Sequence, residues 1–254
     1  MSILDDIVAA KRKRLERGDY GPLPKPAPRG EGAAFVSALS APGVRIVAEI
    51  KGRSPSAGEI LPGAEGQVET IALAYRRGHA AALSVVVEED FFGGRSGWLP
   101  RAKRIAGLPA LMKDFIVSEK QLDFAVSLGA DAVLLIARAL SDEELSRLAS
   151  AARERRLATV VEAHNAEEIR RSAGCGPDVL GVNARDLSTF ETSLDVLAAL
   201  GPSIPEGPVR LAESGIRTKA DVARLRQAGF QAFLVGESLL RHEEPEQLLR
   251  ELRS

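Results

Sequence analysis

The sequence predicts an α/β fold, a closed (β/α)8 barrel of the TIM type with an N-terminal helical extension. After residue 45, eight short apolar, β-rich segments alternate with helical patterns, and this alternation is typical of parallel sheets. The chain has 254 residues, which suits one such barrel, because these barrels run to about 250 residues as a single domain. We therefore expect the extension over residues 1–45 and the barrel over residues 46–254.

The extension is predicted to begin with an amphipathic helix over residues 3–17. Ile3, Ile7 and Val8 can share one stripe of this helix. The basic run Lys11 to Arg14 is expected to point mostly outward and to form a solvated face, which is the usual place for a cluster of like charges.

A connector rich in proline and glycine is expected over residues 18–32, because proline restricts its own backbone and that of the preceding residue. One short helix is expected over residues 33–40. The eight predicted strands follow at residues 46–51, 82–87, 110–113, 131–136, 158–162, 178–182, 209–212 and 232–235.

Helix boundaries between the strands are marked by capping residues. Predicted helix starts have a capping residue followed three positions later by Glu or Gln, at Ser118 and Gln121, Ser141 and Glu144, and Asn165 and Glu168. Glycines stand where helices should end, at Gly78, Gly129 and Gly229. The alternative, a doubly wound open sheet, would favour a GxGxxG turn after its first strand. The turn here is GRSPSAG, which favours the barrel.

Polar residues terminate or follow several of the apolar strands, at Glu49, Lys51, Lys113, Glu162, Asn183, Arg185 and Glu213. In a (β/α)8 barrel, these carboxyl ends of the strands carry the chemistry. A charged residue at the end of an apolar strand is costly unless it is paired. One such residue could have only a structural role, but several together predict a functional cluster suited to acid–base chemistry.

The last two loops predict a phosphate site. Such barrels often bind phosphate with the loops that follow strands seven and eight. The segments SGIR at 214–217 and VGES at 235–238 contain glycines that let backbone N–H groups approach an anion. We therefore expect a small, phosphorylated and anionic substrate.

Composition excludes several other classes of function. The formal net charge is −1, which gives no electrostatic reason to expect a nucleic acid or membrane partner. Cys175 is the only cysteine, the three histidines lie far apart, and no apolar run reaches the roughly 18 residues of a spanning helix. The N-terminus lacks the pattern of a signal peptide. We expect no metal, with Mg²⁺ bound by carboxylates as the alternative that stays open, and a cytoplasmic location.

The chain resembles the indole-3-glycerol phosphate synthase family of tryptophan biosynthesis from about residue 1 to residue 250. This range includes the N-terminal helix, which the resemblance implies packs near the barrel mouth. The matching runs, in order, are AEIKGRSPSAG (48–58), LSVVVEEDFFGG (83–94), LMKDFIV (111–117), GADAVLLIARAL (129–140), VVEAHNAEE (160–168), GVNARDLSTFE (181–191), LAESGIRT (211–218) and FLVGESLLR (233–241). The combination of AEIK-x-x-SPS, KDFI and NxRDL is highly specific.

The resemblance implies a carbon–carbon lyase. Members of the family close the ring of 1-(2-carboxyphenylamino)-1-deoxyribulose 5-phosphate with loss of CO₂ and water. The product is indole-3-glycerol phosphate. No cofactor or metal is implied. A monomer is expected, and contacts with other enzymes of the tryptophan pathway stay open.

The resemblance also implies roles for four charged residues. Lys113 would be the general acid that protonates the carbonyl oxygen. Lys51 would pair with the substrate carboxylate and is a second candidate for the dehydration acid. Glu162 would assist proton removal or hydroxyl departure, and Glu49 would position Lys51 and the other charges. Which lysine acts in which step is left open.

Further residues match the substrate-binding positions of the family. Asn183 and Arg185 would hold the carboxylate and hydroxyls of the substrate, while Glu213 and Ser214 would complete the polar rim. Positions around the phosphate are matched by Arg53, Ser54, Gly215, Gly236 and Glu237. The apolar walls for the aromatic ring are matched by Phe92, Phe115, Leu134 and Ile136.

The sequence departs from the usual family pattern at three places. Ala184 replaces an asparagine in NARDL, Val86 and Val87 stand where the family has a Leu-Thr pair, and Glu237 replaces Ser or Thr. Glu237 puts a carboxylate beside the expected phosphate, so its side chain is a doubtful ligand. The positions of the charged residues expected to act in catalysis are unchanged.

Two other functions are weighed against this one. A Schiff-base aldolase could use Lys113 or Lys51 as a nucleophile on a phosphosugar, and a non-catalytic barrel could bind phosphosugars or a partner. Structural roles are expected for Trp98, which would pack, for His164, and for Cys175, which has no nearby base in sequence.

Overall fold

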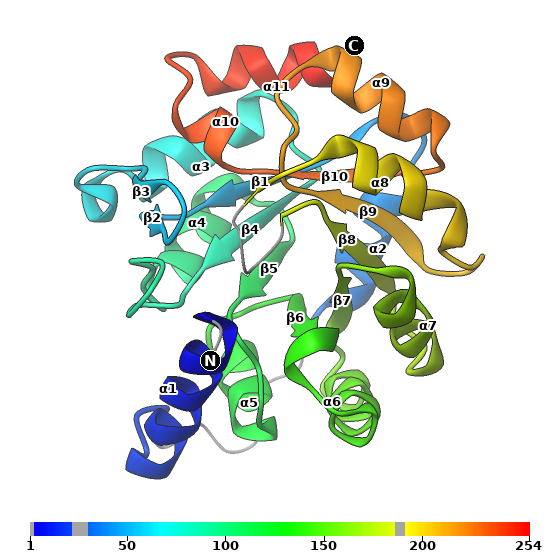
Figure 1. Cartoon of the computed structure of the whole chain (residues 1–254). Coiled ribbons are helices and arrows are strands. Elements are labelled where there is room, and N and C mark those ends of the chain that lie inside the picture. The colour runs from blue at the N-terminus through cyan, green and yellow to red at the C-terminus, as the bar shows by residue number, and fades with distance from the viewer. Residues whose placement is uncertain (1–2, 22–29, 186–190) are drawn as a thin grey trace.

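The computed structural model describes residues 3–21, 30–185 and 191–254, and over these it confirms the predicted closed barrel (Figure 1). All barrel strands are parallel, and the sheet closes in the order β1-β10-β9-β8-β7-β6-β5-β4. The strands are β1 (Arg45–Ile50), β4 (Ala82–Val86), β5 (Ala110–Lys113), β6 (Ala132–Ile136), β7 (Ala158–Ala163), β8 (Val179–Asn183), β9 (Val209–Glu213) and β10 (Ala232–Val235). Each lies within one residue of its predicted bounds.

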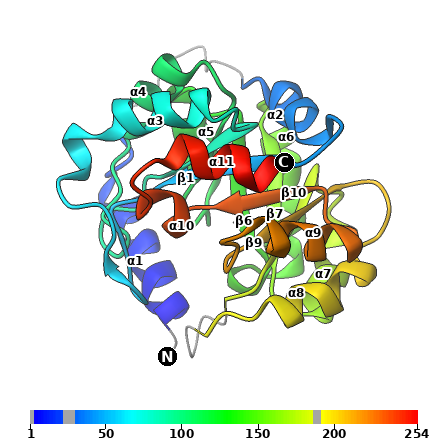
Figure 2. The same cartoon turned by 90° about the horizontal axis from the view of Figure 1, so that it is seen from above.

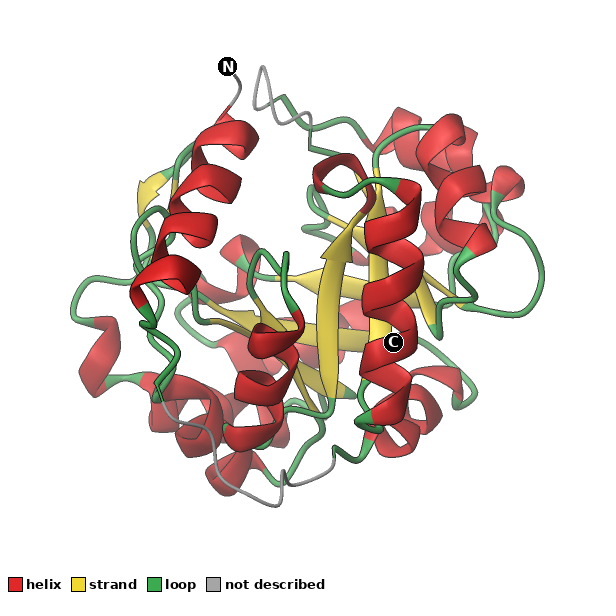
Figure 3. Cartoon of the chain, turned by 90° about the horizontal axis from the view of Figure 1, so that it is seen from below, coloured by secondary structure: helices red, strands yellow, loops and turns green. Residues whose placement is uncertain are grey.

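Helices surround the strands on all sides (Figures 1 and 3). They are α1 (Ile3–Arg17), α2 (Gly32–Ser40), α3 (Val68–Arg77), α4 (Trp98–Ala106), α5 (Glu119–Ser127), α6 (Asp142–Glu154), α7 (Ala166–Gly174), α8 (Leu194–Leu200), α9 (Lys219–Gln227), α10 (Glu237–Leu240) and α11 (Pro245–Arg253). Three 3₁₀ turns, η1 (Ala64–Gly66), η2 (Ala137–Ala139) and η3 (Gly201–Ser203), and a small hairpin of β2 (Arg53–Ser54) and β3 (Gly58–Glu59) complete the described elements.

The predicted capping residues fix where the helices begin. Ser118 and Ser141 each accept a hydrogen bond at the start of their helix, and Gln121 and Glu144 bond back to the cap, so both are capping boxes. The side chain of Asn165 accepts a hydrogen bond from the backbone N–H of Glu168 at the start of α7. These caps satisfy N–H groups that have no partner within the helix.

The second helix of the extension, α2, closes the amino end of the barrel. Phe35 and Leu39 are completely buried and pack with residues near the starts of the strands, such as Val47, Ala132 and Ala158. A Cβ atom at Gly32 would lie 2.4 Å from the backbone nitrogen of Ala158. The glycine therefore lets the start of α2 contact β7 directly.

The first helix, α1, lies on the opposite side of the barrel from α2 (Figure 2), where the strands have their carboxyl ends. Only residues 18–21 and 30–32 of the predicted connector are described, because residues 22–29 lie outside the described part of the chain. None of the helices in the described ranges combines the length and the apolar composition needed to cross a lipid bilayer.

Candidate active site

A cavity of about 670 Å³ opens at the carboxyl ends of the barrel strands. The structure brings all but two of the predicted site residues to its lining: Glu49, Lys51, Ser54, Phe92, Lys113, Phe115, Leu134, Ile136, Glu162, Asn183, Arg185, Ser214, Gly215, Gly236 and Glu237. The exceptions are Arg53 and Glu213. Arg53 is exposed and its guanidinium bonds the carbonyl of Asp90, whereas Glu213 lies behind Lys113.

Lys113, at the end of β5, is surrounded by three carboxylates from other strands. Its ammonium nitrogen lies 2.7 Å from Glu213 Oε2, 3.6 Å from Glu49 Oε2 and 3.9 Å from Glu162 Oε2. The second ammonium of the site, Lys51 Nζ, lies 2.9 Å from Glu49 Oε1. The strands β1, β5, β7 and β9 thus supply one charge cluster.

Neighbouring residues hold these carboxylates in place. The hydroxyl of Ser84 donates to Glu49 Oε2 at 3.3 Å, and the hydroxyl of Tyr75 donates to the backbone carbonyl of Glu49 at 2.9 Å. A Cβ at Gly181 would lie 2.2 Å from Glu213 Oε1. Only glycine at position 181 leaves room for the Glu213 carboxylate in its observed position.

The charges of the cluster are unbalanced, because three buried carboxylates face two ammonium groups. Burial opposes ionisation of Glu49, but Lys51 and Lys113 outweigh it and lower the pKa of Glu49 to about 2. Burial and the nearby charge of Glu162 instead raise the pKa of Glu213 to about 7, against the effect of Lys113. Near neutral pH Glu213 is therefore protonated in part of the molecules, and the proton relieves the excess of negative charge.

The ammonium form of Lys113 is strongly favoured. Burial alone would lower its pKa, but the carboxylates of Glu213, Glu49 and Glu162 raise it well above the ordinary value. Lys113 thus remains a charged hydrogen-bond donor at the centre of the site.

The opposite part of the cavity is lined by two residues with left-handed backbone and by arginines. Ser214 and Gly215 both adopt left-handed conformations, with φ of 70° and 78°. Such a conformation is strained for serine and is common at functional sites. A Cβ at Gly215 would lie 2.7 Å from the Thr192 side chain, and one at Gly236 would lie 2.7 Å from Glu49 Oε1. At both positions the neighbouring atoms leave no room for a side chain, so glycine is required.

Arg185 reaches across this part of the cavity. Its Nη1 donates to Ser56 Oγ at 2.7 Å, and its Nη2 lies 3.9 Å from Glu237 Oε2. Glu237 also pairs with Arg241, 3.2 Å away. The side chain of Glu237 therefore faces arginines, in line with the expectation that it is no direct anion ligand. The Asn183 side-chain oxygen accepts from the backbone N–H of Arg185 at 2.9 Å and fixes the start of this loop. Residues 186–190 of the NARDLSTFE run lie outside the described residues.

An apolar wall faces the charge cluster. Phe92 and Phe115 pack with their ring centroids 5.8 Å apart, and Leu134 and Ile136 of β6 are buried beside the cavity. The resemblance implies that the N-terminal helix packs near the barrel mouth, and α1 does contribute to this lining, through Ile3, Leu4 and Ile7.

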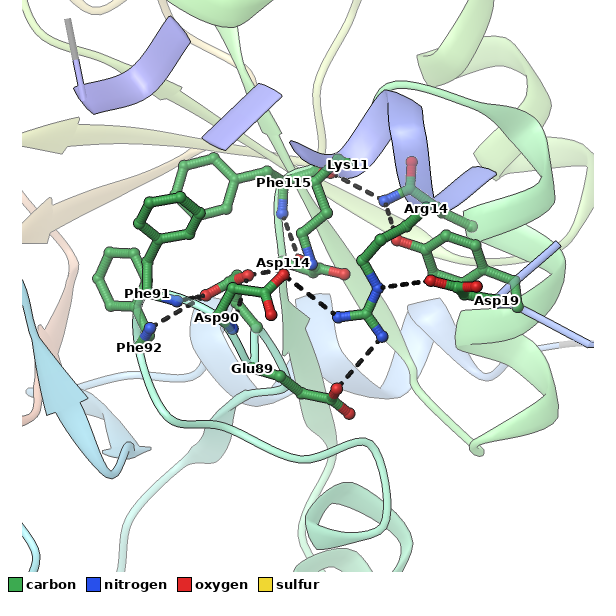
Figure 4. A network of polar contacts seen from close by, with 12 residues as sticks. Lys11, Arg14, Asp19, Glu89, Asp90, Phe91, Phe92, Asp114 and Phe115 are labelled. Atoms are coloured by element: carbon green, nitrogen blue, oxygen red, sulfur yellow. Dashed lines mark hydrogen bonds and ion pairs between the residues drawn. The ribbon is translucent and has the colours of Figure 1, made fainter. Parts of the chain in front are cut away.

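The prediction that the basic run of α1 is a solvated face is wrong for Lys11. The Lys11 side chain is only 2% exposed, and its ammonium lies 2.7 Å from Asp114 Oδ1 and 3.4 Å from Glu88 Oε1 (Figure 4). Both carboxylates are also buried. Arg12 remains exposed, as predicted. Lys11 points inward because two buried carboxylates from the barrel loops need a cation.

Arg14 is also engaged by the loop after β4. Its guanidinium lies 3.2 Å from Glu89, 3.6 Å from Asp90 and 3.5 Å from Asp19 (Figure 4). Two of these acids belong to the β4–α4 loop, so Arg14 adds a second, more exposed set of ion pairs between α1 and the barrel.

Glu88 and Asp114 organise the two loops that carry the aromatic wall. The Glu88 carboxylate accepts the backbone N–H groups of Phe91 at 2.7 Å and Phe92 at 3.0 Å. Asp114 accepts the backbone N–H of Phe115 at 2.8 Å. The ion pairs of Lys11 thus connect α1 to the positions of Phe92 and Phe115.

The structural roles expected for two other residues agree with their surroundings. Trp98 is 2% exposed, and its indole N–H donates to Glu65 Oε2 at 2.6 Å. Cys175 is buried, and burial raises the pKa of its thiol, which disfavours the reactive thiolate.

Comparison with known proteins decides the family. Residues 5–252 match the family model described as indole-3-glycerol phosphate synthase. The chain is 40% identical to the indole-3-glycerol phosphate synthase of Geobacillus thermodenitrificans, with 98% of this chain and 96% of the relative covered. The chain belongs to the indole-3-glycerol phosphate synthase family. The predicted enzyme class, a lyase of tryptophan biosynthesis, is thereby confirmed.

Other comparisons agree with this family and with the fold. The indole-3-glycerol phosphate synthase of Micrococcus luteus is also 40% identical, over 100% of this chain and 98% of its own length. Among solved structures, 3-hexulose-6-phosphate synthase from Salmonella typhimurium matches with a TM-score of 0.65 at 15% identity, covering 82% of this chain and 96% of that one. The latter likeness concerns the fold alone.

Replacing Lys11 by methionine should destabilise the protein. The variant keeps an apolar side chain but leaves Glu88 and Asp114 buried without their cation, which should cost about 3–5 kcal/mol in the free energy of unfolding. Urea denaturation at neutral pH measures this loss. In the control Arg12→Met, whose arginine side chain is 57% exposed, the change should stay within about 0.5 kcal/mol. Equal stability of the two variants would contradict the role of Lys11.

Glu213→Gln should change how stability depends on pH. With a pKa of about 7 when folded and 4.5 as the ordinary value, Glu213 keeps its proton in the folded state after the unfolded state has lost it. Its contribution is therefore complete below about pH 4.5 and is lost as the pH rises to about 7. The wild type should lose stability relative to Glu213→Gln across this window, as urea denaturation at several pH values can measure. The exposed control Glu206→Gln should show no such trend.

Proposed function

We propose that this chain closes the indole ring of 1-(2-carboxyphenylamino)-1-deoxyribulose 5-phosphate with Lys113 as the general acid. The observation that carries the assignment is the convergence of Glu49, Glu162 and Glu213 on the Lys113 ammonium, at 2.7 to 3.9 Å. A charged donor fixed in a buried cluster can stabilise the oxyanion that develops on the substrate carbonyl, because the cluster needs little reorganisation during the reaction.

The shape of the cavity supports one orientation of the substrate. The anthranilate ring would lie against Phe92, Phe115 and the β6 residues of the apolar wall. The phosphate would lie near the backbone N–H groups of Gly215 and Gly236, which both line the cavity. This arrangement would hold the ring carbon that bears the carboxylate next to the ribulose carbonyl, and such positioning lowers the barrier to ring closure.

The reaction would then proceed in three stages. The ring carbon forms a bond to the carbonyl carbon, and Lys113 gives a proton to the carbonyl oxygen. The carboxylate leaves as CO₂, and its bonding electrons restore the aromatic ring. The new hydroxyl leaves as water after protonation, while Glu162 accepts a proton released from the substrate. Lys51, 2.9 Å from Glu49, would pair with the substrate carboxylate before it departs and is the other candidate for the dehydration acid.

The remaining polar residues would bind the substrate. Asn183 shapes the loop of Arg185 through its bond to the Arg185 backbone N–H, and Arg185 would hold the carboxylate and hydroxyls. Ser214 belongs to the strained turn that precedes Gly215. Glu213 would help return the proton that the cluster needs between turnovers, since its pKa is raised to about 7 and it lies beside Lys113.

The electrostatics disfavour a Schiff-base aldolase. A nucleophilic lysine must be neutral, and enzymes achieve this by lowering the pKa of the amine. The three carboxylates around Lys113 do the opposite and raise its pKa. Lys113 therefore suits proton donation better than covalent catalysis.

The chemistry described here uses only side chains of this chain, so the proposal includes no cofactor or metal. The proposal also includes that the protein is a monomer and works in the reducing cytoplasm. Gel filtration with light scattering tests the oligomeric state.

Lys113→Ala should lower kcat by roughly 10²- to 10⁴-fold, the usual effect of losing a general acid. The increase in fluorescence as indole-3-glycerol phosphate forms from the synthetic precursor measures this. Because the variant leaves three carboxylates without their cation, its folding is checked by circular dichroism. The charge-preserving Lys113→Arg should fold but also turn over slowly, since guanidinium does not give up its proton. Near-normal turnover of Lys113→Ala would rule out the assigned role.

Arg185→Ala should raise KM by roughly 10- to 100-fold and change kcat little, because it removes a charged hydrogen bond made already in the bound ground state. The same fluorescence assay at varied substrate concentration separates the two constants. The exposed Arg226→Ala makes the same change in net charge away from the cavity and should leave both unchanged. A fall in kcat at constant KM would mean that Arg185 acts in the chemical step instead.

A further inference from the structure

Behind Glu162, on the side away from the cavity, lies a buried histidine. His164 follows the end of β7 at Ala163, and its side chain is only 4% exposed. Its Nε2 lies 3.4 Å from Glu162 Oε1, whereas the other oxygen of Glu162 faces Lys113. His164 itself does not line the cavity. It can therefore affect the reaction only through Glu162.

The other ring nitrogen of His164 is fixed by Glu168. His164 Nδ1 lies 3.2 Å from Glu168 Oε2, and the His164 backbone N–H donates to the same oxygen at 2.8 Å. Glu168 Oε1 accepts from Arg138 Nε at 2.9 Å and from Asn165 Nδ2 at 2.8 Å. Burial opposes ionisation of Glu168, but its bonds to His164 and Arg138 lower its pKa to about 2. An ionised Glu168 requires a proton on Nδ1.

Because the proton on Nδ1 is already bonded to Glu168, a second proton must lie between Nε2 and Glu162. His164 Nε2 is inaccessible to solvent and has no hydrogen-bond partner within the described residues. Two lone pairs held 3.4 Å apart without water would repel each other. The proton is either on Nε2, which makes His164 an imidazolium between two carboxylates, or on Glu162. Burial and the charge of Arg138 oppose the imidazolium, but the carboxylates of Glu168 and Glu162 outweigh them and raise the pKa of His164.

We infer that His164 is a positioning residue that holds Glu162 ionised and oriented for its work as a proton acceptor. The imidazolium faces Oε1 and leaves Oε2, on the side of Lys113, free to meet the substrate. Glu168 and Arg138 in turn hold the imidazole. This inference rests on the role of Glu162 under the proposed function, and it replaces the purely structural role expected for His164.

The test is the dependence of kcat on pH in His164→Asn. The asparagine amide can take the place of Nδ1 and keep the bond to Glu168, but it cannot reach Glu162 or carry a charge. We expect kcat at neutral pH to fall about tenfold, KM to stay within about twofold, and the acidic limb of the profile to move about one pH unit upward. The upward direction follows because loss of the cation disfavours the ionised carboxylate. The fall in kcat at neutral pH follows separately, because Glu162 loses the partner that orients it.

Two further variants separate charge, orientation and folding. His164→Gln places an amide near the position of Nε2, so it should recover part of kcat while its acidic limb stays shifted. Ser141→Ala removes the cap of another barrel helix, α6, and leaves His164 and Glu168 with their partners. It should lower the melting temperature and leave the pH profile unchanged. A shift of equal size in Ser141→Ala, or unaltered profiles in both His164 variants, would overturn the inference.

Glu162→Gln distinguishes this inference from the function on which it rests. If Glu162→Gln is severely impaired while both His164 variants behave as wild type, the role of Glu162 stands and that of His164 falls. If Glu162→Gln turns over normally, the assignment of Glu162 is wrong and the inference about His164 falls with it.

Discussion

The closed barrel depends on neutralising the charges that its strands bring to one end. Lys113 and its three carboxylates come from β1, β5, β7 and β9, and each alone would be costly to bury. Together the positive and negative charges largely compensate each other. The raised pKa of Glu213 lets this carboxyl group take up a proton, which relieves the remaining excess of negative charge. Because these partners meet only when all eight strands are in register, the arrangement that serves catalysis also specifies the closed sheet.

The same principle extends outward from the centre of the site. Lys11 lies at the back of the aromatic wall and neutralises Glu88 and Asp114, whose oxygens hold the backbone of the loops on which Phe92 and Phe115 lie. Behind Glu162, positive His164 lies between the negative carboxylates of Glu162 and Glu168. The Lys113 ammonium, the Glu162 carboxylate and the loops of the aromatic wall are thus each held by buried charged groups.

The sequence predicted the fold from periodicity, and it predicted most of the candidate site from polar residues at strand ends together with the family resemblance. Strand–helix alternation gave the barrel, and polar residues at strand ends gave Glu49, Lys113 and Glu162. The errors arose where the partner lies on another element. A helical pattern places Lys11 on the polar side of α1 but contains no information about the acids opposite it. Nothing near Arg53 in the sequence indicates that its side chain bonds a neighbouring loop instead of lining the cavity.

The position of α2 constrains the order in which the chain can fold. Phe35 and Leu39 are made early during synthesis, yet the residues that bury them extend from Val47 of the first strand to Ala232 of the last. Until that last strand joins, the barrel is open and this apolar helix has no complete partner surface. Contacts so distant along the chain slow folding. The nascent enzyme therefore exposes a hydrophobic segment through most of its translation, which is a natural target for a chaperone.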